Sequence, residues 1–263
     1  MSYPQTFKKP AVFGLFLLMA SAGSACKQAS TATYERSAVK PAAEAIAEAE
    51  KLYEGREDLL KVRQGIVSLR QAQADDGGNY DLAWRLSKFN YHLGAHSPDS
   101  TEQDKAFHEG IEAGKLAVKL QDAKPEGHFW LGANYGGMAQ ISTLSGFSQV
   151  NDIKEQMDAV LKINEGFQSG SAYMVLGQVY LKAPKIFGGD IEQAIGNLEK
   201  GLKFGANNAL LHLRLAEAYV AAKRNADAQK QIDQILAMKA TPGFEPEHNE
   251  AVSEAKKLQE KIK

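Results

Sequence analysis

The sequence predicts an all-α fold, an α-α solenoid of stacked antiparallel helical hairpins, and three observations support this prediction. From Pro41 onward, apolar residues recur with the period of a helix, and the alternation typical of strands is absent. Glycine, proline, asparagine and aspartate gather mainly between these periodic stretches, where they indicate short turns. A pattern of large and small side chains also recurs along the chain, and such internal repeats are typical of helical solenoids.

The first 26 residues precede the predicted helices and have the pattern of an export signal. Lys8 and Lys9 form a short basic start, and a mostly apolar run follows over residues 11–23. A membrane-spanning helix needs about 20 apolar residues, so this shorter run is typical of a signal peptide over residues 1–25. Cys26 follows directly and is the only cysteine, which excludes a disulfide or a thiolate zinc cage within one chain.

Cys26 lies where cleavage of the signal peptide is expected, and this arrangement resembles a bacterial lipobox. The cysteine of such a box is acylated and becomes the mature N-terminus, which would attach the protein to a membrane. Gly23 stands where the box usually has leucine, and Gly23, Ser24 and Ala25 also fit ordinary signal cleavage. We favour a lipoprotein on the periplasmic face of a bacterial membrane, and Lys27 after the cysteine favours the outer membrane.

Residues 26–40 predict a tether between this anchor and the helices. They are rich in serine, threonine and alanine and lack helical periodicity. A flexible chain of this length spans about 20 Å on average. The tether would therefore hold residues 41–263, one helical domain, clear of the membrane surface.

Eleven helices are expected in that domain, and their short connections predict that neighbours run antiparallel. The expected ranges are about 42–54, 57–74, 80–94, 101–121, 127–142, 150–165, 170–183, 190–203, 208–222, 226–238 and 246–262. Residues 75–79 predict a turn, because they lack the alternating oxygens and the terminal glutamate of a calcium loop. Residues 188–190 lack a P-loop lysine, and Asp190 with Gln193 instead predicts a capping box.

A repeated signature lies on the first helix of successive hairpins, where a large residue precedes leucine, a small residue and tyrosine at fixed offsets. The three copies are His128/Leu131/Gly132/Tyr135, Tyr173/Leu176/Gly177/Tyr180 and His212/Leu215/Ala216/Tyr219. The second helices carry Ala194/Leu198/Gly201 and Ala228/Ile232/Ile235, with Ile235 the imperfect match. This spacing is the tetratricopeptide signature. The small residues allow the two helices of a hairpin to approach, and the larger ones fill the space between hairpins.

The repeats are longer than the usual period of about 34 residues. The signature leucines, Leu86, Leu131, Leu176 and Leu215, show this lengthening. The extra residues fall in loops, notably residues 143–151 and 182–189, and the helices keep their register.

A resemblance to a known family covers roughly residues 80–238. The matching strings are Trp84-Arg85-Leu86-Ser87, Gly110 to Ala117, Glu126 to Gly132, Leu176-Gly177 with Tyr180, Ala183-Pro184, Gly188-Gly189-Asp190 with Ala194, and Leu215 to Tyr219. These strings resemble the T-component family of TRAP (tripartite, periplasmic-binding-protein-dependent) transporters. More distantly, the array resembles the regulator of microtubule dynamics proteins, which share a pair like His128/Trp130. The bacterial-style leader favours the transporter family.

The transporter resemblance implies a function as well as a fold. It implies a periplasmic lipoprotein that forms a homotrimer and partners a periplasmic solute-binding protein. The implied role is the handling of a small hydrophobic ligand in a solute uptake system.

Patterns for catalysis or metal binding are weak. His92 and His96 have metal-ligand spacing, but Gly94 lies between them and no carboxylate completes a site, which favours a solvated helix end. His128 and His212 occupy the large-residue position of the repeat, so they are expected to pack. The sequence therefore predicts neither an enzyme nor a cofactor. A formal net charge of −1 without a basic block argues against nucleic acid as a partner.

The first helices of tetratricopeptide arrays line a groove, two positions before the signature leucine and two and five after it. These positions are Trp84, Lys88, Tyr91, Phe129, Ala133, Gly136, Met174, Gln178, Leu181, Leu213, Glu217 and Val220. Most are large and apolar, which is unusual for a wetted face. Either they line a binding groove, or other helices cover them and make them core.

The candidate site taken from this set is Trp84, Lys88, Tyr91, Phe129, Met174, Gln178 and Leu181. The favoured function is a non-catalytic accessory binding component of a TRAP-type uptake system. The alternative is a scaffold that recognises a peptide or protein during envelope assembly. A clamp for a peptide carboxylate would need several basic residues along the groove, and Lys88 alone qualifies, which favours an apolar ligand.

Overall fold

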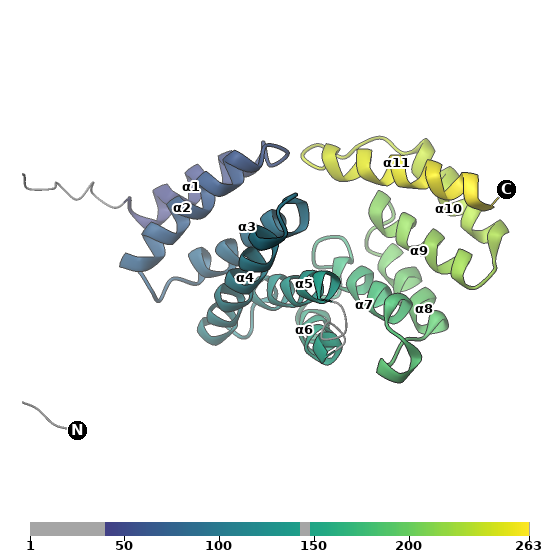
Figure 1. Ribbon diagram of the computed structural model, residues 1–263, viewed down its shortest axis with the longest axis horizontal. Helices are drawn as coiled ribbons and strands as arrows, with labels where there is room; N and C mark the ends of the chain where they lie inside the picture. Colours follow the sequence, from purple (N-terminus) through teal and green to yellow (C-terminus); the bar gives the residue numbers. More distant parts are fainter. Residues whose placement is uncertain (1–39, 143–147, 263) are drawn as a thin grey trace, which may run out of the picture. The chain divides into compact units, whose positions relative to one another are not determined.

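The computed structural model describes residues 40–142 and 148–262, which form eleven α-helices with no strand among them (Figure 1). The helices are α1 (Ala42–Tyr53), α2 (Leu59–Asp75), α3 (Tyr80–His96), α4 (Ser100–Leu120), α5 (Pro125–Ile141), α6 (Val150–Ile163), α7 (Ser171–Lys182), α8 (Ile191–Leu202), α9 (Ala209–Ala221), α10 (Asn225–Ala237) and α11 (Glu245–Ile262). The predicted all-α solenoid and each of its helices are confirmed. The signal peptide and Cys26 lie outside the described residues.

Local capping decides where the helices begin. The Asp58 side chain accepts a hydrogen bond from the backbone N–H of Leu60, so α2 starts at Leu59, two residues later than expected. Pro125 occupies the first turn of α5, where its fixed φ favours the helix and its missing N–H costs nothing, and α5 therefore starts early.

The predicted cap of α8 is present, with a different partner for Gln193. The Asp190 carboxylate accepts from the backbone N–H groups of Glu192 at 2.9 Å and Gln193 at 3.0 Å. In a capping box the side chain at the position of Gln193 would accept from the N–H of Asp190. Here the Gln193 amide donates to the carboxylate at 3.1 Å, and the Asp190 N–H donates to the carbonyl of Tyr180.

Each helix packs against its neighbour in sequence, and the first helices of successive hairpins also meet. The odd-numbered helices form this inner row through the contacts α1–α3, α3–α5, α5–α7, α7–α9 and α9–α11. A row of first helices is the geometry of a tetratricopeptide solenoid. Among the described residues, no helix is long and apolar enough to span a membrane.

The small residues of the signature mark the closest approaches between paired helices. A Cβ at Gly177 of α7 would overlap Leu198 of α8, and a Cβ at Gly132 of α5 would overlap Met157 of α6. A Cβ at Gly94, near the end of α3, would likewise overlap Phe107 of α4, and α3 continues past this glycine to His96. The predicted close approach of the first and second helices of a hairpin at small residues is therefore confirmed.

Candidate functional site

The inner row surrounds a cavity of about 1140 Å³. Its wall comes from the end of α1, from α3, α5 and α7, and from four segments that connect helices or begin them, residues 54–57, 168–169, 203–210 and 241–248. The helices contribute aromatic, thioether and amide side chains, and the segments contribute amides, aromatic rings and carboxylates. The cavity is therefore mixed in character, whereas the sequence predicted that these positions form either an apolar groove or core.

Five of the seven candidate residues line this cavity. They are Lys88, Tyr91, Phe129, Met174 and Gln178. Ala133 and Gly136, which the same spacing selects, also line it.

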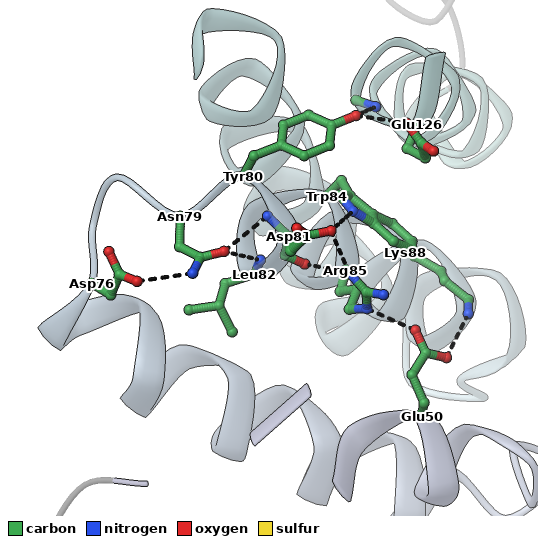
Figure 2. A network of polar contacts seen from close by, with 11 residues as sticks. Glu50, Asp76, Asn79, Tyr80, Asp81, Leu82, Trp84, Arg85, Lys88 and Glu126 are labelled. Atoms are coloured by element: carbon green, nitrogen blue, oxygen red, sulfur yellow. Dashed lines mark hydrogen bonds and ion pairs between the residues drawn. The ribbon is translucent and has the colours of Figure 1, made fainter. Parts of the chain in front are cut away.

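Trp84 and Leu181 do not line the cavity, and neither do Leu213, Glu217 and Val220. The indole Nε1–H of Trp84 donates to the Asp81 carboxylate at 3.1 Å, and the Arg85 guanidinium lies 4.0 Å from the Trp84 ring centre (Figure 2).

The C-terminal part of the inner row is core. Leu181 packs against the core cluster that α8, α9, α10 and α11 share. Leu213 is buried in that cluster together with Ala251 and Ala255 of α11. The inner row therefore lines a cavity over part of α3, α5 and α7, and it is core in its C-terminal part.

Lys88 is already paired inside the protein. Its Nζ donates to the carboxylate of Glu50 at 3.2 Å and lies 3.8 Å from the ring centre of Tyr53. Arg85 donates to the other oxygen of Glu50 at 2.8 Å, so one α1 carboxylate holds two cations of α3 (Figure 2). Burial lowers the pKa of Lys88, and Glu50 opposes this effect. Lys88 therefore supports α1–α3 packing and leaves no free cation on α3 for a peptide carboxylate.

Aromatic rings form the wall contributed by α3 and α5. The centroids of Tyr91 and Trp130 lie 5.7 Å apart, and those of Phe129 and Trp130 lie 5.0 Å apart in an edge-on pair. Phe129 is 5% exposed and Trp130 is 8% exposed, so both are mostly core and contribute only a small exposed area to the cavity wall. Met174 of α7 is partly buried and extends this wall.

A buried ion pair forms another part of the wall and joins the first hairpin to the last helix. Arg56, between α1 and α2, donates through Nε to one carboxylate oxygen of Glu247 at 3.1 Å and through Nη2 to the other at 2.6 Å. Nη2 also donates to the carbonyl of Gly243 at 2.9 Å. The Arg56 side chain is 6% exposed and that of Glu247 is 32% exposed. Sequence reasoning missed this pair because 191 residues separate its members and no local pattern relates them.

His92 supports the same connection and corrects the expectation of a solvated helix end. Its side chain is buried, and Nε2–H donates to the carbonyl of Arg56 at 3.1 Å. The His96 ring stacks on it with 4.1 Å between centroids. Burial and the neighbouring His96 lower the pKa of His92 to about 4.

We expect this buried histidine to make stability depend on pH. An unfolded histidine titrates near pH 6.5 and the folded one near 4, so the unfolded state binds more protons between these values. The free energy of unfolding should therefore fall by about 2–3 kcal/mol as the pH drops from about 6.5 to about 4. Urea denaturation at several pH values measures this fall.

The variant His92→Gln keeps an N–H donor and should remove most of that slope. Glu102 provides an internal comparison. Hydrogen bonds from Arg63 and Ser97 lower its pKa to about 2, so its contribution to the free energy of unfolding is lost only at more acidic pH. An unaltered slope between pH 6.5 and 4 in His92→Gln would contradict the assignment.

The two signature histidines are packed, as predicted, and lie outside the cavity. Nδ1 of His128 lies 2.8 Å from the amide oxygen of Gln156, and Nε2–H donates to the carbonyl of Asp122 at 2.9 Å. His212 repeats this arrangement with Gln231 at 2.7 Å and Ala206 at 3.0 Å. No group of three or more His, Cys, Asp or Glu in the described ranges could hold a metal ion.

These features define a tetratricopeptide-type helical scaffold with an internal cavity, and sequence comparison agrees. A tetratricopeptide-repeat family model matches residues 188–243. The model for regulator of microtubule dynamics protein 1-3 matches residues 45–183, more than half of the chain. The chain therefore belongs to the regulator of microtubule dynamics protein 1-3 family, the more distant of the two resemblances in the sequence. No curated protein sequence matches the chain.

Solved structures share the fold at low sequence identity. A thermophilic tetratricopeptide protein of Thermus thermophilus is 15% identical over 82% of this chain and 98% of its own, with a TM-score of 0.62. The pilF protein of Pseudomonas aeruginosa is 16% identical over 84% of this chain and 92% of its own, with a TM-score of 0.53. Proteins of the tetratricopeptide fold are generally non-catalytic scaffolds that mediate protein–protein interaction.

Proposed function

We propose that this protein is a binding scaffold whose cavity holds a segment of a protein partner. The observation that carries the proposal is the size of the cavity together with its mixed lining. Pockets for small molecules enclose roughly 300–1,000 Å³, and this cavity, at about 1140 Å³, exceeds that range. It has room for several residues of an extended chain.

The lining also suits a peptide chemically. Three glutamines, Gln140, Gln168 and Gln178, and two asparagines, Asn207 and Asn208, line the cavity. Their amides both donate and accept hydrogen bonds, which is what the backbone of an extended segment requires. The Tyr91, Phe129 and Met174 wall would receive its apolar side chains.

Cross-linking from inside the cavity tests the proposal. A photo-reactive amino acid replaces Gln178, which lines the cavity, or Lys230, whose side chain is 72% exposed on α10 outside it. We expect a covalent adduct with a protein partner in the native host from position 178 only. Equal adducts from the two positions, or none from position 178, would count against a partner in the cavity.

A cavity-filling variant makes the test specific. A Cβ at Gly136 meets no atom within 4 Å, so Gly136→Phe should project a ring into the cavity without disturbing the helix, and it should suppress the adduct. Gly196 of α8 is equally open and lies outside the cavity, so Gly196→Phe is the matched control and should leave the adduct unchanged.

The second candidate is the accessory component of a TRAP-type uptake system. The resemblance of the sequence to that transporter family and the Tyr91, Phe129 and Met174 wall support it. It would bind a small hydrophobic ligand, partner a periplasmic solute-binding protein and form a homotrimer. Native mass spectrometry of protein purified from membranes should then show a retained apolar molecule, which Gly136→Phe displaces. A bare polypeptide mass in the wild type would leave the protein-binding scaffold as the stronger candidate.

The pattern of residues 1–26 supports a place for the protein at the periplasmic face of the outer membrane, attached through Cys26. We expect a mature N-terminus that begins with acylated Cys26, and extraction from membranes only with detergent. The variant Cys26→Ser should yield soluble protein or uncleaved precursor. Mass spectrometry of the mature N-terminus tests for this acylation, and an unmodified terminus would exclude the lipid anchor.

A further inference from the structure

The charges that line the cavity do not balance. Five carboxylates and three basic side chains belong to its wall. Two of the carboxylates are neutralised within the protein, Glu50 by Arg85 and Lys88, and Glu247 by Arg56.

The remaining carboxylates are exposed and belong to the two segments that Arg56 joins through Gly243 and Glu247. They are Glu54 and Glu57, at the end of the first helix and just after it, and Glu245, at the start of α11. None of these three carboxylates takes part in a hydrogen bond or an ion pair with the described residues. Among the three basic side chains of the wall, the same is true of Lys203 alone. An occupant therefore meets a net negative charge.

Exposed aromatic rings also line the cavity. Phe244 is 60% exposed and Phe204 is 43% exposed, and both line the cavity. The protein already places cations on rings here, because Lys88 Nζ lies 3.8 Å and the Arg56 guanidinium 5.2 Å from the centre of the Tyr53 ring. A carboxylate beside an aromatic face is a favourable environment for an ammonium or guanidinium group.

We infer that the segment this cavity holds is basic, with a lysine or arginine next to an apolar residue. This inference rests on the proposed function and specifies its partner. The cationic group would lie between Glu54, Glu57 and Glu245 and the exposed phenylalanines, and the apolar neighbour would contact the Tyr91, Phe129 and Met174 wall. Charge complementarity of this kind selects the partner and makes binding sensitive to salt.

Three blocked pentapeptides test the inference by isothermal titration calorimetry on the mature protein. Each has a phenylalanine flanked on both sides by lysine, by norleucine or by glutamate, with alanine at the ends. We expect the lysine peptide to bind about tenfold tighter than the norleucine peptide, with the glutamate peptide weakest. The advantage of lysine should shrink severalfold between about 0.05 M and 0.5 M salt.

Matched variants locate the effect. The triple change Glu54→Gln, Glu57→Gln and Glu245→Gln should abolish the lysine preference. The control triple Glu155→Gln, Glu192→Gln and Glu260→Gln removes the same charge from exposed positions outside the cavity, and Glu192 lies in the first turn of its helix as Glu245 does. The control should retain the preference.

The possible outcomes distinguish a failure of this inference from a failure of the proposed function. If the lysine and norleucine peptides bind with equal affinity and Gly136→Phe blocks both, the inference of a basic segment is wrong. The cavity would then still be a binding site. A preference that the control triple also loses would likewise overturn it. Binding of none of the three peptides would overturn the inference, and absence of an adduct from position 178 would then remove the proposed function as well.

Discussion

Replacing Gly177 with leucine should lower the free energy of unfolding by about 1–3 kcal/mol, because α7 and α8 touch at this point. A Cβ at Gly177 would overlap the fully buried Leu198, and a leucine adds three more carbons in the same space. Overpacking forces side chains from their preferred rotamers or separates the helices, and a tightly packed interior offers little room for either. Urea denaturation measures the loss.

Gly196→Leu on α8 is the matched control. A Cβ there meets no atom within 4 Å, so leucine gains helix propensity of up to about 1 kcal/mol without a clash. The exposed Lys182→Ala should also be nearly neutral. If Gly177→Leu and Gly196→Leu shift the melting temperature equally, the helix pairing through Gly177 is wrong.

Removal of Glu247 should cost more stability than removal of Arg56. Glu247→Ala leaves a guanidinium that is 6% exposed, with the backbone carbonyls of Gly243 and Tyr53 as its remaining acceptors. Loss of one partner of a buried pair costs about 3–5 kcal/mol. The partial exposure of Glu247 reduces this, so we expect about 2–4 kcal/mol. Arg56→Met should cost only about 1–2 kcal/mol, because its apolar chain keeps contact with Tyr53 and the freed carboxylate can hydrate.

A double-mutant cycle on this pair separates the interaction from the cost of each truncation. The double variant Arg56→Met/Glu247→Ala should be more stable than Glu247→Ala alone, since it leaves no buried cation. Hydrogen exchange over residues 241–248 should rise in each variant, because this segment loses its link to the first hairpin. A greater loss from Arg56→Met than from Glu247→Ala would contradict the burial of the guanidinium.

Helical class and repeat register were predictable because they depend on short-range patterns. Leu176, Gly177 and Tyr180 lie within two turns of one helix, and any hairpin that buries them must bring the small residue against its partner. The Asp190 cap is local for the same reason. The family was harder to rank from motifs, because the leader that favoured the transporter component says nothing about the repeats themselves.

The site was only partly predictable, since register alone does not determine what covers a residue. Trp84, Phe129, Met174 and Leu213 share one position in successive repeats, yet only Phe129 and Met174 line the cavity. Arg85 covers the ring of Trp84, and the core shared with α11 buries Leu213. The segments 203–210 and 241–248 complete the wall and carry no part of the repeat signature.

By itself, the sequence determined an all-α solenoid, its helix pairs and its row of inward positions, because periodicity and residue size act over a few residues. The tertiary structure alone decided that a cavity remains between the inner helices, that its lining is mixed and net acidic, and that Arg56 meets Glu247. Those features depend on contacts between segments far apart in the chain. Such contacts form only when the accumulated rotation of successive hairpins brings the first hairpin to the last helix.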